Sequence, residues 1–383
     1  MTKKIWTWFM LLIFVIIILA IIGILYGVSK KSTTSTTKET IKIGAILPLT
    51  GTAAPNGIYL KNGIDLAIDE INSNGGINGR KIEVIYEDSK NDPAEGVSVF
   101  NKIVNTERNV HAIVVFGSGV SNPLIPIANE KKINLLLTAV ALPGITDRSE
   151  YAFRFFPNEN DDANTMISCL ENKFPEIDKL AFLYVNDEFG VSALKAFEKR
   201  FKGELVIKEA YGKSDTDFRT IVTKVKYSNA KGVYISGYTS SGVLLIKQLR
   251  EADIKIPIFA YFALALPAHL KATGEAANGV YYTATLFDAS SSDPVVSKFV
   301  ESYKKRYGEV PNSFNAFTYD TIYMLKFAIE KYDYTTEGIR RGLSEIKNFP
   351  GVLGYSTVQQ NRDVIYPLRV VQFDNGGFKE ICR

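Results

Sequence analysis

Cysteine and histidine are scarce in this chain of 383 residues, which contains two of each. Cys169 and Cys382 are too few for a disulfide-rich scaffold or a four-cysteine metal site, and whether they pair with each other stays open. His111 and His269 lie far apart among apolar residues, which argues against a histidine-based zinc site. We therefore expect no metal site and no cofactor.

A concentrated basic patch is also missing. The 45 Lys and Arg residues outnumber the 41 Asp and Glu residues by four, and they are scattered along the chain. This pattern argues against a nucleic-acid partner. A hydrophobic content of 46% and a charged content of 22% are ordinary for a globular protein, and the length suffices for two packed domains.

The N-terminal segment carries a long uncharged run from Ile5 to Val28. It is long enough to cross a hydrocarbon core of about 30 Å, and longer than the apolar region of roughly 7–15 residues in a cleavable signal. No cleavage site stands out and no cysteine lies near its end, so residues 1–31 predict an uncleaved signal anchor and exclude a bacterial lipoprotein anchor. Residues 32–40, STTSTTKET, read as a polar linker that cannot build a core.

From Ile41 onward, strand-like and helix-like segments alternate. IKIGAILP reads as a buried strand, and Gly57 to Asn72 has apolar residues at helical spacing. The alternation restarts with KLAFLYV at Lys179, and Asn315 to Tyr332 reads as one amphipathic helix. The pattern predicts an α/β protein with two Rossmann-like lobes, each built on a parallel sheet.

One segment, VVFGSGVSNP, runs from a predicted strand into small residues and a helix predicted from Asn122 to Lys131. It therefore lies at the carboxyl edge of a sheet, where α/β proteins bind ligands. Unpaired amides at a helix N-terminus stabilise an anion, and Ser118 and Ser121 add hydroxyl donors. The alternative, that these small residues only allow tight strand–helix packing, stays open.

Two other sites that such a segment can form do not fit. A phosphate loop needs GxxxxGK followed by Ser or Thr, and no lysine follows Gly119 before Lys131. A nucleophile elbow needs G-x-S-x-G, whereas Gly117, Ser118 and Gly119 are contiguous. No paired acid and nucleophile emerges elsewhere, so we expect no enzyme activity.

The order of several motifs is more specific than any one of them: IKIGAILPLTG, NGIDLAIDEINSNGGINGRKIEVIYEDSKNDP, FGSGVSNP, LPGIT, YAFRFFPNE, YVNDEFG, YISGY and FTYD. In this order the chain from Ile41 to about Lys379 resembles the leucine/isoleucine/valine-binding proteins of ABC importers, which are type I periplasmic binding proteins. The resemblance implies two lobes joined by three crossings that close on a ligand by hinge motion. It places the crossings near Phe156, Thr285 and Gly351. Lobe 1 then comprises residues 41–156 and 286–350, and lobe 2 residues 157–285 and 351–383.

The resemblance also assigns site residues. The family's carboxylate-binding serine falls on Ser118, next to Gly119 and Ser121. In the family, a backbone carbonyl at one position holds the ligand's ammonium group, and a threonine hydroxyl at another holds both of its charged groups. These positions fall on Ala139 and Ala141, so the threonine hydroxyl is missing in this chain. The family's glutamate for the ammonium belongs in FAYFALA, which contains no acid. Since an unpaired buried ammonium is costly, carboxylates without an amine and neutral polar solutes become candidates beside amino acids.

Aromatic residues complete the expected site. Phe189 and Tyr238 fall where the family presents aromatic rings to the ligand, and Asn56 replaces a residue that is often aromatic. Tyr261 sits at a strand end and is a further candidate wall residue. Aromatic walls bury apolar ligand surface, and tyrosine adds a polar tip.

The function implied by the resemblance is an extracytoplasmic solute-binding protein, anchored in the cell membrane by a single pass and delivering a small ligand to an ABC permease. We expect a monomer without catalytic residues. The alternative is a ligand-sensing receptor, which would need a partner protein because the chain carries no signalling domain.

Overall fold

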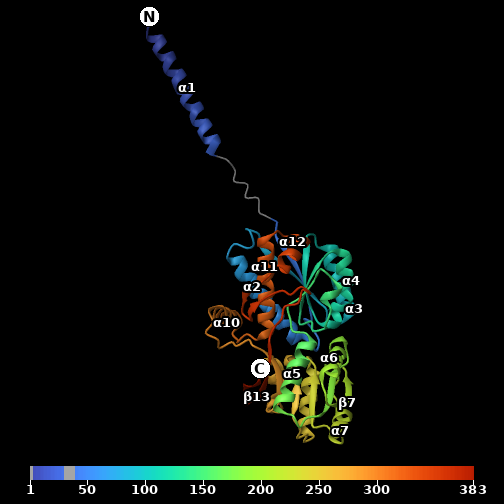
Figure 1. Ribbon diagram of the computed structural model, residues 1–383. Coiled ribbons are helices and arrows are strands. Elements are labelled where there is room, and N and C mark those ends of the chain that lie inside the picture. Colours follow the sequence, from blue (N-terminus) through green and yellow to red (C-terminus); the bar gives the residue numbers. More distant parts are fainter. Residues whose placement is uncertain (1–2, 30–38) are drawn as a thin grey trace. The chain divides into compact units, whose positions relative to one another are not determined.

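The computed structural model describes residues 3–29 and 39–383, which form two separate compact units, residues 1–39 and 40–383. The first unit contains helix α1, Lys3–Ser29 (Figure 1). Its stretch Trp6–Gly23 has a mean hydropathy of 2.7 and is long and apolar enough to cross a membrane, a test that a signal sequence also meets. Most of the linker predicted at residues 32–40 lies outside the described residues.

The second unit begins with a five-stranded parallel sheet of order β2-β1-β3-β4-β5. Its strands are β1 (Ile41–Leu47), β2 (Ile82–Asp88), β3 (Val110–Phe116), β4 (Asn134–Thr138) and β5 (Ala152–Arg154). The associated helices are α2 (Ala54–Ser73), α3 (Pro93–Thr106), α4 (Ser118–Lys131), α10 (Pro294–Tyr307), α11 (Ser313–Lys331) and α12 (Thr336–Ser344), with the 3₁₀ turn η1 (Thr146–Arg148) and the hairpin β11 (Phe349–Gly351) and β12 (Gly354–Ser356).

Strands β1, β3 and β4 are buried almost throughout because helices cover both faces of the sheet. Helices α2 and α11 pack together on one side, and α3 and α4 pack together on the other (Figure 1). The continuous apolar runs that predicted these strands therefore reflect burial on two faces.

A seven-stranded mixed sheet of order β14-β13-β10-β9-β8-β6-β7 forms the second lobe. Its strands are β6 (Lys179–Val185), β7 (Glu204–Tyr211), β8 (Gly232–Ser236), β9 (Ile258–Ala260), β10 (Tyr281–Thr285), β13 (Leu368–Asp374) and β14 (Gly377–Cys382). Its helices are α5 (Glu159–Lys173), α6 (Glu188–Arg200), α7 (Arg219–Lys226), α8 (Ser240–Glu251) and α9 (Pro267–Thr273), with the 3₁₀ turns η2 (Phe262–Ala265) and η3 (Gly274–Ala277). The prediction of two α/β lobes is confirmed.

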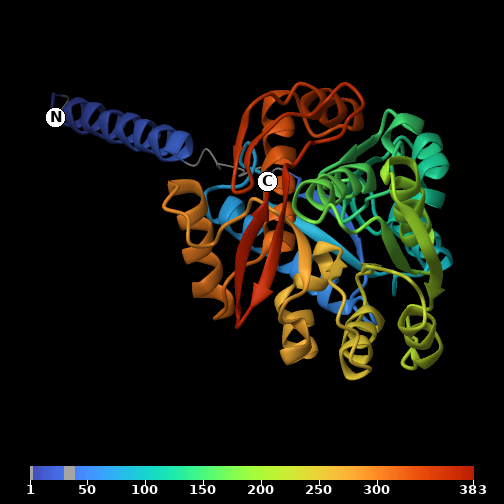
Figure 2. The same cartoon turned by 60° about the horizontal axis from the view of Figure 1, so that its bottom comes forward.

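Strands β13 and β14 are antiparallel and form a hairpin at one edge of this sheet (Figure 2). The second sheet is therefore mixed, whereas the sequence predicted parallel sheets. Helix α4 also begins at Ser118, four residues before the predicted Asn122. Gly117, with a φ of 85°, turns the chain directly into the helix, so Pro123 lies inside it.

The chain passes between the two sheets three times: between β5 and α5, between β10 and α10, and between Val364 and β13. The third passage follows a short parallel pairing in which the Val364 amide donates to the Arg154 carbonyl (2.9 Å) and the Arg154 amide donates to the Arg362 carbonyl (3.0 Å). We propose that the lobes divide at these passages, so that lobe 1 extends to Val364 rather than ending at Pro350.

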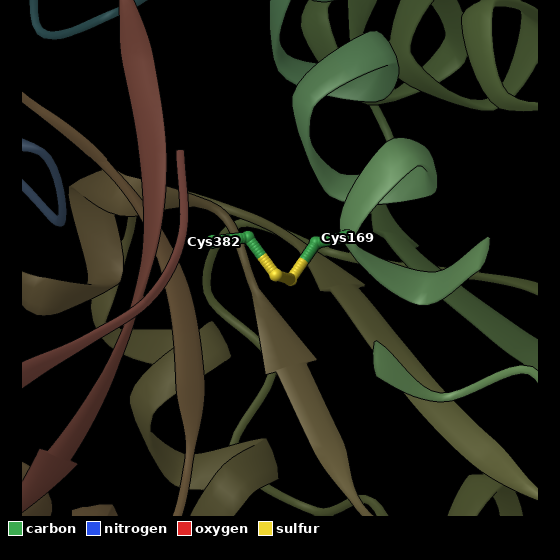
Figure 3. The surroundings of a disulfide bond; sticks show 2 residues. All are labelled: Cys169 and Cys382. Atoms are coloured by element: carbon green, nitrogen blue, oxygen red, sulfur yellow. A yellow bond between two sulfur atoms is a disulfide. The ribbon is translucent and has the colours of Figure 1, made fainter. Parts of the chain in front are cut away.

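A disulfide joins Cys169 on α5 to Cys382 at the end of β14, 213 residues away (Figure 3). It fixes the C-terminal hairpin to the helix that follows the first passage. Sequence analysis left this pairing open, because the distance between two cysteines in space does not follow from their spacing in the chain.

Reducing this disulfide should lower the free energy of unfolding by about 2–5 kcal/mol, because a cross-link over a long loop restricts the unfolded chain. Thermal unfolding with and without dithiothreitol measures the change. The Cys382→Ser variant should unfold at the lower temperature under both conditions. A wild-type midpoint that does not respond to dithiothreitol would show that the bridge contributes nothing.

Asp320 on α11 fixes the turn of the β11–β12 hairpin. Its carboxylate accepts hydrogen bonds from the amides of Val352 (2.9 Å) and Leu353 (3.0 Å). A Cβ on Gly351 would lie 2.4 Å from the Asp320 Oδ2 atom, so glycine is needed there. Burial raises the pKa of Asp320 to about 7, although the two amide bonds act in the opposite direction.

The Asp320→Asn variant should lose one component of the pH dependence of stability. An unfolded aspartate has a pKa of about 3.9, so between about pH 3.9 and 7 the native state holds a proton that the unfolded state lacks. The contribution of Asp320 to the free energy of unfolding is fully present below about pH 3.9. It falls by about 1 kcal/mol per pH unit as the pH rises towards 7.

Urea unfolding of both proteins at about pH 5, 6 and 7 measures this slope. Asp162, whose pKa burial raises to about 6, titrates in both proteins and cancels in the comparison. Parallel profiles would contradict the assignment.

Candidate ligand-binding site

A cavity of about 20 Å³ lies where the carboxyl ends of the strands of both sheets face each other. Its lining comes from both lobes: Asn56, Phe116, Gly117, Ser118, Ala139, Phe156, Phe189, Tyr238, Tyr261, Ala263 and Phe314. A single buried water needs roughly 10–15 Å³. The lobes are therefore closed over a space much smaller than an amino acid.

Ser118 is the first residue of α4 and is buried at the cavity wall. Its Oγ atom accepts a hydrogen bond from the Ala141 amide (3.2 Å), which leaves its proton to donate. In the first backbone hydrogen bond of α4, the Ser121 amide donates to the Gly117 carbonyl (2.9 Å). The amides before Ser121 therefore make no hydrogen bond within the helix. This combination suits an anion or a carbonyl oxygen.

Ala139 follows β4 and lines the cavity with a left-handed backbone, φ 50°. Such a conformation is uncommon for alanine and costs on the order of 1 kcal/mol, so surrounding structure imposes it. Ala141 is buried beside Ser118 but does not line the cavity. It links two neighbours through its backbone: its amide bonds to Ser118, and its carbonyl accepts from the Glu159 amide (2.9 Å).

Asn56 and Tyr238 connect the two lobes across the cavity. The Asn56 side chain, in the first turn of α2, donates from Nδ2 to the Tyr238 carbonyl (2.8 Å). Its Oδ1 atom is buried without a hydrogen-bond partner among the described residues. The wall of the cavity thus offers an acceptor to a ligand that carries an N–H or O–H group.

The Tyr238 hydroxyl makes a second connection between the lobes. It accepts from Asn91 Nδ2 (2.8 Å) on the lobe 1 side and donates to Asp187 Oδ2 (2.5 Å) at the start of α6. Burial raises the pKa of Tyr238 well above its usual value, and the Asp187 carboxylate adds to the rise. The hydroxyl therefore stays protonated and can keep donating to Asp187.

The aromatic wall contains residues that sequence analysis named and others that it missed. Phe189 meets Tyr238 and Tyr261 edge-on, with ring centroids 5.2 and 4.8 Å apart. Phe156 and Phe314, 5.7 Å apart, were not predicted. Phe156 lies in YAFRFFPNE, one of the motifs that carry the family resemblance, so the sequence held a signal for it. Phe314 lies on α11, outside all of these motifs, so the sequence held none.

The structure brings six of the nine predicted site residues to the cavity: Asn56, Ser118, Ala139, Phe189, Tyr238 and Tyr261. Gly119, Ser121 and Ala141 lie behind the lining. A Cβ on Gly119 would be 3.9 Å from the Cβ of Glu188, so Gly119 faces α6. No group of metal-ligating side chains occurs within residues 3–29 and 39–383.

Comparison with known proteins identifies the family. The sequence model of the periplasmic binding proteins matches residues 40–378. The chain belongs to this family. It is 26% identical to Leu/Ile/Val-binding protein homolog 3 of Brucella melitensis over 88% of this chain and 92% of that protein. It is also 26% identical to Leu/Ile/Val-binding protein BraC3 of Rhizobium johnstonii, over 85% and 89%.

Solved structures agree with this periplasmic binding protein fold. The branched-chain amino acid transporter substrate-binding protein LivJ of Streptococcus pneumoniae, in complex with isoleucine, is 25% identical. It matches with a TM-score of 0.82 over 89% of this chain and 98% of its own. The leucine-binding protein LivK of Thermotoga maritima gives the same identity and TM-score, over 89% and 97%. The type I periplasmic binding fold and the family resemblance are confirmed, and this is a family of solute-binding proteins rather than enzymes.

Replacing Tyr238 by phenylalanine should lower the free energy of unfolding by about 1–3 kcal/mol, because the buried Asn91 loses its acceptor and the half-buried Asp187 loses a donor. Denaturant unfolding measures the change. Tyr227→Phe is the control, since Tyr227 is 82% exposed and should tolerate the same change. Equal stability of the two variants would show that the Tyr238 hydroxyl does not hold the lobes together.

Proposed function

We propose that this chain is the extracytoplasmic solute-binding protein of an ABC importer of the branched-chain amino acid type. It captures an amino acid, or a related carboxylate or amide, between its lobes and delivers it to the permease. The observation that carries this proposal is the cavity at the strand ends, lined from both lobes, with Ser118 at the N-terminus of α4.

The chemistry of the cavity fits such a ligand. Ser118 and the first amides of α4 suit a carboxylate, and the rings of Phe189, Tyr238 and Tyr261 suit an apolar side chain. Relatives described as Leu/Ile/Val-binding, and the LivJ structure in complex with isoleucine, support the same ligand class. Hydrogen bonds to charged groups contribute about 1.5–3 kcal/mol each, so a few of them with aromatic burial reach micromolar affinity, about −8 kcal/mol.

The small closed cavity makes lobe movement part of binding. A ligand of amino acid size enters when the lobes separate, and it is buried when they close at the three passages. The closed surface is then what the permease recognises. We propose that α1 tethers a monomeric binding unit to the outer face of the cell membrane and that no catalytic turnover occurs.

Ligand binding is tested by thermal unfolding of the full chain in detergent, after carried-over ligand has been removed by partial denaturation. The probes are L-leucine, L-isoleucine, 4-methylpentanoate and 3-methylbutylamine. A ligand at about a hundred times its dissociation constant stabilises the fold by about 2.7 kcal/mol. We expect stabilisation by the ligands that carry a carboxylate and none by the amine alone, because Ser118 and the helix terminus select the anion.

The Ser118→Ala variant should bind such a ligand at least about tenfold more weakly, with little change in its own stability, because it loses one hydrogen bond to a charged group. Ser121→Ala is the matched control, since Ser121 lies on the same helix but outside the lining. Isothermal titration calorimetry measures both affinities. Unchanged affinity in Ser118→Ala, or a loss in Ser121→Ala alone, would reject Ser118 as the anchor.

A further inference from the structure

A groove of about 740 Å³ lies along one face of the second sheet. Arg369, Val371 and Phe373 alternate along β13 and so share this face. Their cross-strand partners Ala284 on β10 and Phe378 on β14 line the groove as well. Small-molecule sites have volumes of about 300–1,000 Å³. The groove is therefore large enough to hold part of a ligand.

The lining of the groove is mainly apolar. It includes Leu266, Leu270, Phe287, Val371 and Phe373. Its charged side chains have partners within the protein: Arg369 Nη1 donates to Glu380 Oε2 (2.9 Å), and Asp288 Oδ1 accepts from the Ser290 amide (2.8 Å). An apolar occupant therefore fits this surface better than a charged one.

The groove and the ligand cavity meet at two aromatic rings. Phe262 lines the groove, whereas its neighbours Tyr261 and Ala263 line the cavity. In the same way Ser313 lines the groove and Phe314 lines the cavity. The ring centroids of Phe262 and Phe314 are 6.0 Å apart, and both side chains are buried. Displacing these two rings would join the two spaces.

The cavity itself suits an amide better than a free ammonium group. Within residues 39–383, the residues that line it include no aspartate or glutamate, so a buried ammonium would lack a counter-charge in the lining. The unpaired Asn56 Oδ1 atom can accept a hydrogen bond from an amide N–H. Because the closed cavity measures only about 20 Å³, a substituent on that nitrogen must extend beyond it.

We propose that the protein binds N-acylated amino acids whose acyl chain displaces the rings of Phe262 and Phe314 and lies in the groove. Ser118 binds the carboxylate, and Asn56 accepts the amide N–H. This rests on the proposed solute-binding function and deepens it by naming the ligand class. Residues 310–313 line the groove from lobe 1 and β13 lines it from lobe 2, so the acyl chain contacts both lobes when they close.

The test is isothermal titration calorimetry of the full chain in detergent with L-leucine, N-acetyl-L-leucine and N-hexanoyl-L-leucine. The wild type should bind N-acetyl-L-leucine at least about threefold more tightly than leucine, because no ammonium is buried. It should bind N-hexanoyl-L-leucine at least about tenfold more tightly than N-acetyl-L-leucine, because further methylene groups leave water.

The Ala284→Phe variant places a ring in the groove and leaves the residues that line the cavity unchanged. Its preference for the hexanoyl over the acetyl ligand should fall below about threefold, because the ring occupies the space of the chain. This ratio within one variant does not depend on the fraction of folded protein. Ala272→Phe, at an exposed position outside the groove, is the matched control and should keep the wild-type preference.

Three results would overturn the inference while leaving a solute-binding protein in place. One is equal affinity of the wild type for the acetyl and hexanoyl ligands, which decides the question even if Ala284→Phe does not fold. Another is a preference that persists in Ala284→Phe. The third is a wild type that binds leucine more tightly than both acylated ligands. If the wild type bound none of the three, the inference and the proposed amino-acid ligand class would both fail.

Discussion

Tyr238 is held by side chains of the opposite lobe at both its carbonyl and its hydroxyl, and the cavity depends on these bonds. Asn56 binds the carbonyl, and Asn91 binds the hydroxyl. Within lobe 2, Asp187 accepts the hydroxyl proton and so fixes the ring beside Phe189. The same residue therefore closes the lobes and forms part of the wall, so that opening the cleft also takes the wall apart.

In the closed arrangement the cavity wall contains a polar atom without a partner among the described residues, and the proposed ligand can supply one. When the lobes separate, Asn56 Oδ1 can bond to water, whereas in the closed arrangement it is buried and unpaired. An unsatisfied buried acceptor costs about 1–3 kcal/mol. A ligand that donates a hydrogen bond there interacts more strongly with the closed form than with the open one, which is the condition for shifting the equilibrium towards closure.

Local patterns were sufficient to predict the alternation of strands and helices, because buried parallel strands such as Ile41–Leu47 are apolar throughout. They were also sufficient to place Ser118 at a sheet edge. Long-range pairings were beyond them: the antiparallel pairing of β10 with β13, the disulfide, and the pairing of Arg154 with residues 362–364 join distant segments.

A buried ion pair near the first passage links segments that lie far apart in the sequence. Arg154, the last residue of β5, forms its ion pair with Asp363, beside the third passage. Thr146 (2.8 Å) and Asn361 (3.1 Å) also donate to Asp363, so that carboxylate joins donors from three segments. Arg154, which is buried, thus helps to hold two crossing segments together.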